Sequence, residues 1–436
     1  MSAGHHNRVG NILAALVGNA FPPLASIATA PILALALGVD GRGAVASVTA
    51  PLFLAVALAT FGVPASVTRT IARQPWLTTA FVWRAASVLI AVGTVVTGVL
   101  MLTAPFFGGG DDTLVSLIRL AAVALVPSLL TTLLQALASG RHRWRLVTVE
   151  RAVTAGVRLV ALGSLALAGV LDVLSAVAVL ALAPVVGAVA YVGLLRRAPI
   201  ERPVDAVDTS ARAVVSFGAR VWFGSVAGVL LTRLDQALIT PLSGAVELGL
   251  YVVAVNVADV PLVISNAVRD VSFAADAAEA DDRRMLAASR ISSALTVVVT
   301  GLLAVSAGWW VPAVFGQQFA AAVPACLVLL LATAVGGQGA LAGVTLSARG
   351  APGRRSLSLI VAAAVNTLLV LLLVPELGAV GAAIATLVGS FVSSSLNVVQ
   401  VWRRHGIHPW SFYGLRASDL RACVRAVRRL STGPSI

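Results

Sequence analysis

Runs of about twenty apolar residues, bounded by charges, glycine or proline, recur along the whole of this 436-residue chain. A helix needs about 20 such residues to cross the hydrocarbon core of a bilayer, and it satisfies its own backbone hydrogen bonds there. With 58% hydrophobic and only 11% charged residues, the chain has too little polar surface to cover a soluble globule. We therefore predict an all-α polytopic membrane protein with twelve transmembrane helices. The predicted spans are residues 12–37, 44–62, 80–104, 114–138, 146–169, 173–195, 214–240, 246–270, 289–312, 321–346, 356–374 and 379–402.

The charged residues outside these spans are unevenly distributed. All 31 basic residues are arginine, and those outside the spans gather at both ends of the chain and in alternate loops. The other loops hold Arg42 as their one arginine. Because basic loops are retained in the cytoplasm, we predict that both termini are cytoplasmic. The net charge of +13 then reports membrane orientation, and no nucleic-acid partner is expected. The loops on the opposite side carry Asp40, Asp111, Asp112, Asp172, Glu247 and Glu376.

An internal repeat indicates two lobes. The segment "GLLRRAPI" at 193–200 is similar to "QVWRRHGI" at 400–407, and both lie at the end of a sixth span. Two halves with an even number of spans enter the membrane from the same side, as in parallel-repeat transporters. The predicted units are an N-terminal six-helix lobe at 1–195, a cytoplasmic linker at 196–213, a C-terminal six-helix lobe at 214–402, and a basic amphipathic tail at 403–436. We expect this tail to lie on the anionic cytoplasmic leaflet, and the alternative is a tail that docks a protein.

Several polar residues fall inside the predicted spans, where a charge costs about 2.5 to 3.5 kcal/mol and tends to face protein or water. Arg151 and Arg158 are seven residues apart, hence on nearly one face of their helix, and Arg158 lies close to the midplane. For every such residue the alternative is an ion pair between helices that only positions the bundle. The candidates for a substrate cavity are Arg158, Arg151, Arg119, Arg233, Asp235, Asp259 and Asn256.

The stretch "LLTRLDQALI" at 230–239 places two opposite charges in one span. On a helix, Arg233 and Asp235 are about 200° apart and cannot pair with each other. We expect two separate contacts near the outer end of the seventh span, with both side chains partly reaching the membrane interface.

Signals of a soluble enzyme are missing from the sequence. No glycine-rich phosphate loop, zinc-ligand spacing or nucleophile elbow is found, and no segment between spans is long enough to build a core of its own. Cys326 and Cys423 are far apart in the sequence, so a structural disulfide is not expected. We predict a protein that is not an enzyme and has no cofactor or metal.

Several stretches resemble a known family. The most specific are R-x-D followed by G-x-Y at 233–251 and P-x-x-G-x-x-G-A-A at 375–383, together with "LALALGVDGRGAVASV" at 33–48 and "FGVPASVTRTIAR" at 61–73. They are similar to the Wzx-like polysaccharide flippases of the multidrug/oligosaccharidyl-lipid/polysaccharide (MOP) exporter superfamily. The likeness extends over nearly the whole chain, from about Gly10 to Arg404.

The resemblance implies a V-shaped bundle of two lobes around a central cavity that opens alternately to the two faces of the bacterial cytoplasmic membrane. It also implies a cargo, an oligosaccharide on polyprenyl pyrophosphate, and partners such as membrane lipids and a polysaccharide polymerase or glycosyltransferases. It leaves open whether H⁺ or Na⁺ drives transport. Arginine forms charge-assisted, often bidentate bonds to phosphate, so Arg158, Arg151 and Arg119 are hypothesised to contact this cargo.

Three other functions are weighed against this one. A cation-coupled multidrug exporter of the same superfamily would carry an acid in its first lobe, where Glu150 is the one acid within a span. A lipid II flippase usually has fourteen helices and a basic first helix, unlike this chain. A non-transporting scaffold of a polysaccharide assembly complex is the more distant alternative.

Overall fold

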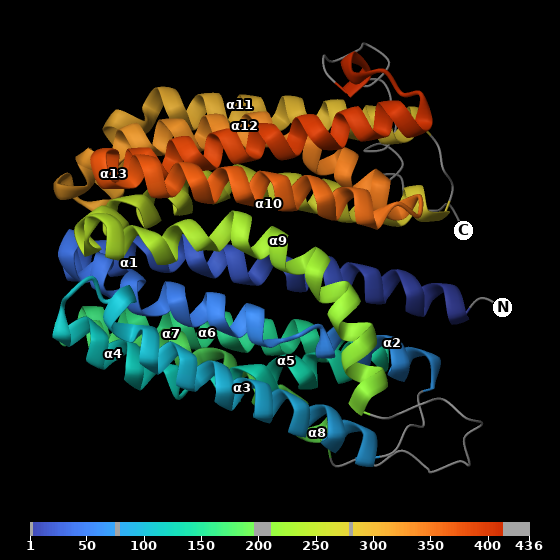
Figure 1. The fold of residues 1–436 in the computed structure, drawn as a ribbon, viewed down its shortest axis with the longest axis horizontal. Helices are drawn as coiled ribbons and strands as arrows, with labels where there is room; N and C mark the ends of the chain where they lie inside the picture. Colours follow the sequence, from blue (N-terminus) through green and yellow to red (C-terminus); the bar gives the residue numbers. More distant parts are fainter. Residues whose placement is uncertain (1–2, 75–78, 196–210, 279–281, 413–436) are drawn as a thin grey trace.

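The structure is a computed structural model that describes residues 3–74, 79–195, 211–278 and 282–412. Within those ranges every regular element is a helix (Figure 1). The first elements are α1 (Ala3–Ala59), α2 (Val63–Arg73), α3 (Thr79–Phe107), α4 (Asp112–Ala122), α5 (Leu125–Gly140), α6 (Trp144–Leu167), α7 (Val173–Gly187), the 3-10 helix η1 (Ala188–Tyr191) and α8 (Val192–Leu195). They are followed by α9 (Ala211–Ser243), α10 (Ala245–Ala278), α11 (Asp282–Phe315), η2 (Gln317–Ala322), α12 (Val323–Ala348), α13 (Pro352–His405) and η3 (Pro409–Phe412).

The two longest helices are each bent at a glycine. Gly38 in α1 has φ 68° and Gly378 in α13 has φ 53°, a left-handed conformation that glycine adopts without the strain of a side chain. Each bend separates two predicted spans, so α1 and α13 each supply two arms. Eight helical segments of the described chain are long and apolar enough to cross a membrane. Each of the twelve predicted spans falls mostly on helical residues, and this is consistent with twelve crossings.

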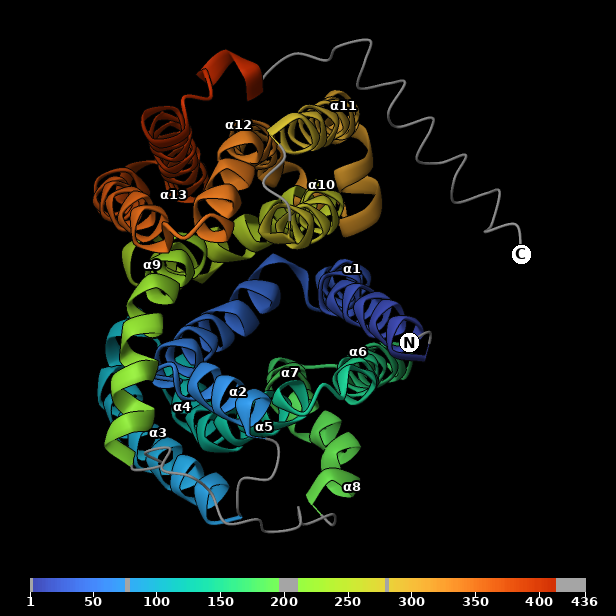
Figure 2. The same cartoon turned by 90° about the vertical axis from the view of Figure 1, so that its right-hand side faces the viewer.

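The helices form two lobes, as predicted (Figures 1 and 2). Helices α1 to α8 occupy one side, and α10 to α13 occupy the other. Helix α9 starts beside the first lobe and ends in the second, and it packs on α1, α2 and α3 as well as on α10 and α13. Because α1 begins and α13 ends on the same side of the molecule, we call that side the terminal face (Figure 1). The exact boundaries of the lobes stay predictions, and the linker from 196 to 210 and the tail from 413 lie outside the described residues.

Glycines let the two lobes meet closely along α1. A Cβ added to Gly43 would lie 2.0 Å from the carbonyl oxygen of Ala245, and one added to Gly249 would lie 2.5 Å from that of Val39. One turn further on, the Ser47 and Thr240 hydroxyls are 2.7 Å apart. The lobes are therefore in backbone contact on the side opposite the terminal face. We call these residues of α1, α9 and α10 the glycine seam.

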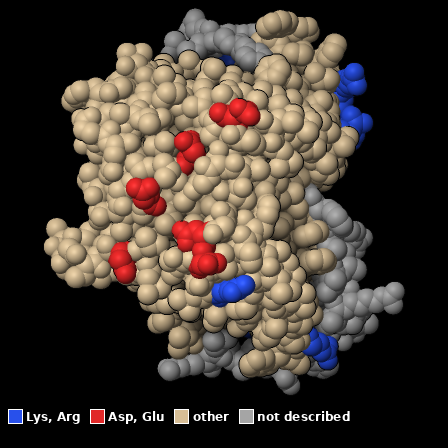
Figure 3. All heavy atoms as spheres, turned by 60° about the vertical axis from the view of Figure 1, so that its left-hand side comes forward, with Lys and Arg blue, Asp and Glu red and all other residues tan. Residues whose placement is uncertain are grey.

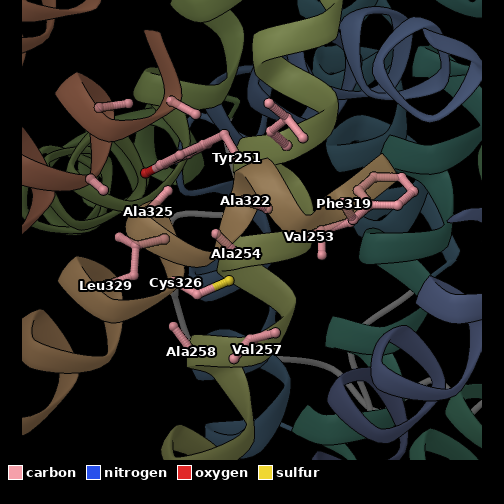
Figure 4. Packing of buried hydrophobic residues seen from close by; sticks show 14 of the residues in the cluster. Tyr251, Val253, Ala254, Val257, Ala258, Phe319, Ala322, Ala325, Cys326 and Leu329 are labelled. Atoms are coloured by element: carbon pink, nitrogen blue, oxygen red, sulfur yellow. The ribbon is translucent and has the colours of Figure 1, made fainter. Parts of the chain in front are cut away.

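The core of the C-terminal lobe is built from small residues between α10 and α12 (Figure 4). Ala254 and Ala325 are fully buried, and the larger side chains of Tyr251 and Phe319 fill the remaining space. Cys326 is a free thiol within this packing. Close approach of helices through alanine is typical of membrane bundles, where packing rather than water exclusion holds helices together.

Acidic side chains gather on the side opposite the terminal face (Figure 3). Asp40 and Glu376 are exposed beside the bends of α1 and α13, and Asp112 is exposed at the first residue of α4. Asp172 caps α7 by accepting from the Ser175 N–H at 2.8 Å, and its hydrogen bonds with Ser175 lower the pKa of its carboxyl. The separation of charge along the sequence is thus retained in space.

Candidate functional site

Arg158 of α6 points toward the first arm of α1. Its Nη1 lies 3.5 Å from Ser26 Oγ, and its Nη2 lies 3.4 Å from Thr29 Oγ1, so both hydrogen bonds are long. Its Nε is buried and has no hydrogen-bond partner in the described structure. A half-buried guanidinium held this loosely retains most of its capacity to bind an anion.

Arg42 is a second arginine in the same region. It follows the bend of α1, is 7% exposed, and also has a buried Nε without a partner in the described structure. Arg42 repels Arg158 through space, and Arg158 in turn repels Arg233 of α9. Guanidinium groups from α1, α6 and α9 are thus coupled electrostatically, Arg42 with Arg158 and Arg158 with Arg233. We call Arg42, Arg158 and Arg233 the arginine cluster.

The sequence analysis did not place Arg42 at the site. Arg42 is the one arginine among the acidic loops, so it is an exception to the separation of charges along the sequence. That exception could have marked it as a candidate site residue. Its neighbour Gly43 lets this part of α1 pack closely in the glycine seam. A loop arginine next to glycines is thus buried here instead of facing water.

Arg233 is exposed to a cavity of about 470 Å³ in the C-terminal lobe. Helices α9, α10, α12 and α13 surround this cavity, which we call the C-terminal cavity. Asp259 of α10 lines it and attracts Arg233 electrostatically. The other polar residues of its lining include Asp235, Arg355, Thr386, Ser390, Ser394 and Asn397.

Asp235 is tied into a buried network at the wall of the C-terminal cavity. It is 3% exposed and accepts hydrogen bonds from the Tyr251 hydroxyl, from Thr386 Oγ1 at 3.2 Å and from the Gln236 N–H at 2.7 Å. No ion pair joins Asp235 to Arg233 in the described structure, as predicted from their angular separation. The expectation that Asp235 reaches toward the membrane interface is wrong, because its hydrogen bonds hold it between α9, α10 and α13.

Arg151 lines a second cavity, of about 400 Å³, between α2, α5, α6 and α9. When the Gln135 amide is oriented with its oxygen toward Arg151, that oxygen accepts from Nη2 and Nε at 2.9 and 3.3 Å. The neighbouring Glu150 is buried against α7 and accepts from Thr154 at 3.1 Å, so it faces away from the cavity. We call this the Arg151 cavity.

The structure does not bring two candidates to these sites. Arg119 is exposed, and its Nε lies 3.4 Å from the carbonyl oxygen of Met101 on α3. The Asn256 amide donates to the carbonyl of Val252 in its own helix at 2.8 Å. Neither lines one of the two cavities. No group of three or more His, Cys, Asp or Glu that could hold a metal occurs among the described residues.

Comparison with known families decides the affiliation of the chain. Residues 9–273 match the model of a family described as "Polysaccharide biosynthesis protein". The chain belongs to this family. The resemblance noted from the sequence is thereby confirmed, although no curated protein matches the chain.

Solved structures share the fold of this polysaccharide biosynthesis protein. The lipid II flippase MurJ in an inward closed conformation has a TM-score of 0.71 at 10% identity, over 91% of this chain and 87% of that one. A multidrug resistance MATE family transporter of the MOP superfamily, facing inward, has a TM-score of 0.64 at 15% identity, over 87% and 94% of the two chains. The same type of transporter facing outward gives 0.62 at 15% identity, over 92% and 96%. The fold is thus that of the MOP superfamily.

In this family member, Arg42 and Arg158 of the arginine cluster each have a buried Nε without a hydrogen-bond partner in the described structure. An anion placed in the arginine cluster would relieve the mutual repulsion of the guanidinium groups and satisfy the free Nε–H groups. The site is therefore suited to bind phosphate or another anion reversibly.

Proposed function

We propose that this protein is an alternating-access flippase, which turns a polyprenyl-pyrophosphate-linked oligosaccharide from the inner to the outer leaflet of the bacterial cytoplasmic membrane. Its role is transport and not catalysis, its termini lie in the cytoplasm, and its partners are the lipid-linked sugar, the surrounding lipids and the glycosyltransferases or polymerase of the same route. Membership of the polysaccharide biosynthesis family and the MOP fold support the proposal.

The observation that carries the proposal is the arginine cluster. Pyrophosphate brings more than one negative charge, and Arg158 and Arg233 approach it from different lobes. Binding would therefore attract the lobes toward a common charge and lower the repulsion between them. When the anion is released, the repulsion between the guanidinium groups returns. The bound and free states therefore favour different arrangements of the two lobes.

A multidrug exporter is the second candidate, and Asp259 is the observation that favours it. A carboxylate in the C-terminal cavity could attract a cationic drug or a coupling ion, H⁺ or Na⁺. Arg233 lies close enough to attract this carboxylate, and that lowers the affinity of the cavity for an organic cation. The anionic lipid is therefore the better match.

The test uses a strain from which this protein has been deleted. We expect the strain to accumulate lipid-linked oligosaccharide, and wild-type protein to restore export. Arg158→Ala should lower export by about tenfold or more at equal membrane abundance, because a charge-assisted hydrogen bond contributes about 1.5 to 3 kcal/mol. Arg145→Ala is the matched control, since Arg145 is exposed in the first turn of the same helix.

The outcomes separate the two candidates. A deletion strain without accumulated lipid-linked sugar contradicts the proposed function. Restored export together with full activity of the Arg158→Ala protein contradicts the role of the arginine cluster. A deletion strain that becomes sensitive to cationic drugs, with normal sugar export, favours the multidrug exporter.

A further inference from the structure

The Arg151 cavity exists because the second arm of α1 ends in an unusual break. Phe61 and Gly62 both have positive φ, 45° and 69°, and a Cβ on Gly62 would lie 2.0 Å from the carbonyl oxygen of Gly218 in α9. Phe61 stacks on Trp222 of α9 with ring centroids 4.6 Å apart, and Trp222 Nε1 donates to the Leu58 carbonyl at 2.8 Å. The break thus anchors α9 beside α2 and leaves a space in front of α5 and α6.

Three of the hydroxyl groups that line this cavity, all from threonine, are arranged as acceptors. Thr60 donates its proton to the Ala57 carbonyl at 2.9 Å. Thr68 and Thr132 likewise donate to backbone carbonyls, at 3.2 and 2.7 Å. A hydroxyl has one proton and two lone pairs, so each of these oxygens can still accept a hydrogen bond but has no second proton to give. These three positions therefore favour a ligand that brings hydrogen-bond donors.

The charge of the Arg151 cavity further restricts the class of ligand that it can bind. Arg151 brings a cation, and the lining residues include no aspartate or glutamate in the described structure. An organic cation therefore finds nothing to neutralise it. A sugar supplies several O–H donors for Thr60, Thr68 and Thr132, and its ring oxygens or a carboxylate can accept from the guanidinium. A cavity of about 400 Å³ is within the range of small-ligand sites.

We propose that the Arg151 cavity binds the sugar end of the lipid-linked oligosaccharide and selects between sugars, while the arginine cluster binds the pyrophosphate. This inference rests on the proposed function. It divides recognition between two places, an anion site at the lobe interface and a hydroxyl-accepting site built by α2, α5, α6 and α9.

The experiment measures binding of two probes to the purified full-length protein. One probe is polyprenyl pyrophosphate without sugar, and the other is the lipid-linked oligosaccharide extracted from the deletion strain. The variant is Thr68→Val combined with Thr132→Val, which keeps the shape of both side chains and removes their acceptor oxygens. The control is Thr103→Val, because Thr103 also donates to a carbonyl of its own helix, at 2.8 Å, but lies outside both cavities.

We expect the double variant to bind the sugar-bearing lipid about tenfold more weakly than wild type and the sugarless lipid equally well. Thr103→Val should bind both as wild type does. Arg158→Ala, in contrast, should weaken the binding of both probes.

The inference is overturned if the double variant keeps full affinity for the sugar-bearing lipid, or if it loses affinity for both probes to the same extent. In either case the proposed function survives, provided that Arg158→Ala still weakens both. A wild-type protein that binds neither probe overturns the proposed function itself.

Discussion

Charged side chains are held differently in the two lobes. In the C-terminal lobe, Asp235 accepts from Tyr251 and Thr386, and Glu247 accepts from the Ala379 N–H at 2.8 Å, next to the bend of α13. In the N-terminal lobe, Arg42 and Arg158 each bury an Nε with no partner in the described structure. Two carboxylates are thus tied to neighbouring helices, whereas two guanidinium groups are left available.

This difference separates structural charges from binding charges. A buried carboxylate with several donors fixes the positions of the helices that supply them, and removing it leaves those donors unsatisfied. A buried guanidinium with an unused donor destabilises the free protein slightly and gains a partner when an anion binds. We infer that Asp235 and Glu247 hold helices of the C-terminal lobe in position, whereas Arg42 and Arg158 are available to bind a ligand.

The largest effect is expected from Asp235→Ala. It leaves the Tyr251 hydroxyl, which is fully buried, with Thr386 as its remaining partner, and it should lower the free energy of unfolding by about 3 kcal/mol. Thermal unfolding of the purified protein measures this. Asp259→Ala is the control, because Asp259 lines the same cavity and should cost less than about 1 kcal/mol. Equal losses of stability in both variants would show that the hydrogen bonds of Asp235 contribute no more to stability than the contacts of Asp259.

A smaller effect is expected from Arg42→Gln, on binding and not on stability. Affinity for polyprenyl pyrophosphate should fall by about tenfold, while the unfolding temperature stays the same or rises, because an unpartnered charge is removed from the interior. Isothermal titration and thermal unfolding give the two readouts. A lower unfolding temperature with unchanged affinity would make Arg42 a structural residue and remove the contrast between the lobes.

The smallest effect is expected from Asn256→Leu. The Asn256 amide donates within its own helix and lines neither cavity, so export should stay within about twofold of wild type. Complementation of the deletion strain measures export. A clear loss of export would mean that Asn256 contacts the cargo in another conformation. The polar residues of α10 would then bind the cargo instead of only stabilising the helix bundle.

Much of the fold could be predicted because the length and apolar composition of membrane helices can be recognised in the sequence. Each predicted span falls mostly on helical residues, and the bends at Gly38 and Gly378 fall between two spans. Their nature as left-handed glycines inside continuous helices could not be foreseen, since it depends on contacts such as the Glu247 carboxylate beside Gly378.

The candidate site was predicted less completely, for a physical reason. A single helix gives the face on which a charge lies, but not which helix covers that face. Arg158 and Arg151 share nearly one face, yet Arg158 contacts α1 while Arg151 lies in a cavity with α2, α5 and α9. Arg42 was missed because its burial results from the lobes meeting, which no local pattern encodes.

The glycine seam has a consequence for how the lobes could part. At Gly43 and Gly249 the contacting surfaces are backbone, and beside them the Ser47 and Thr240 hydroxyls lie 2.7 Å apart across the junction. Parting the lobes here therefore gives up close backbone contacts and the hydrogen bond between Ser47 and Thr240. A single methyl group, in Gly43→Ala or Gly249→Ala, would act as a wedge in this junction and hold that side of the molecule ajar, which makes it a simple means of trapping one state for structural study.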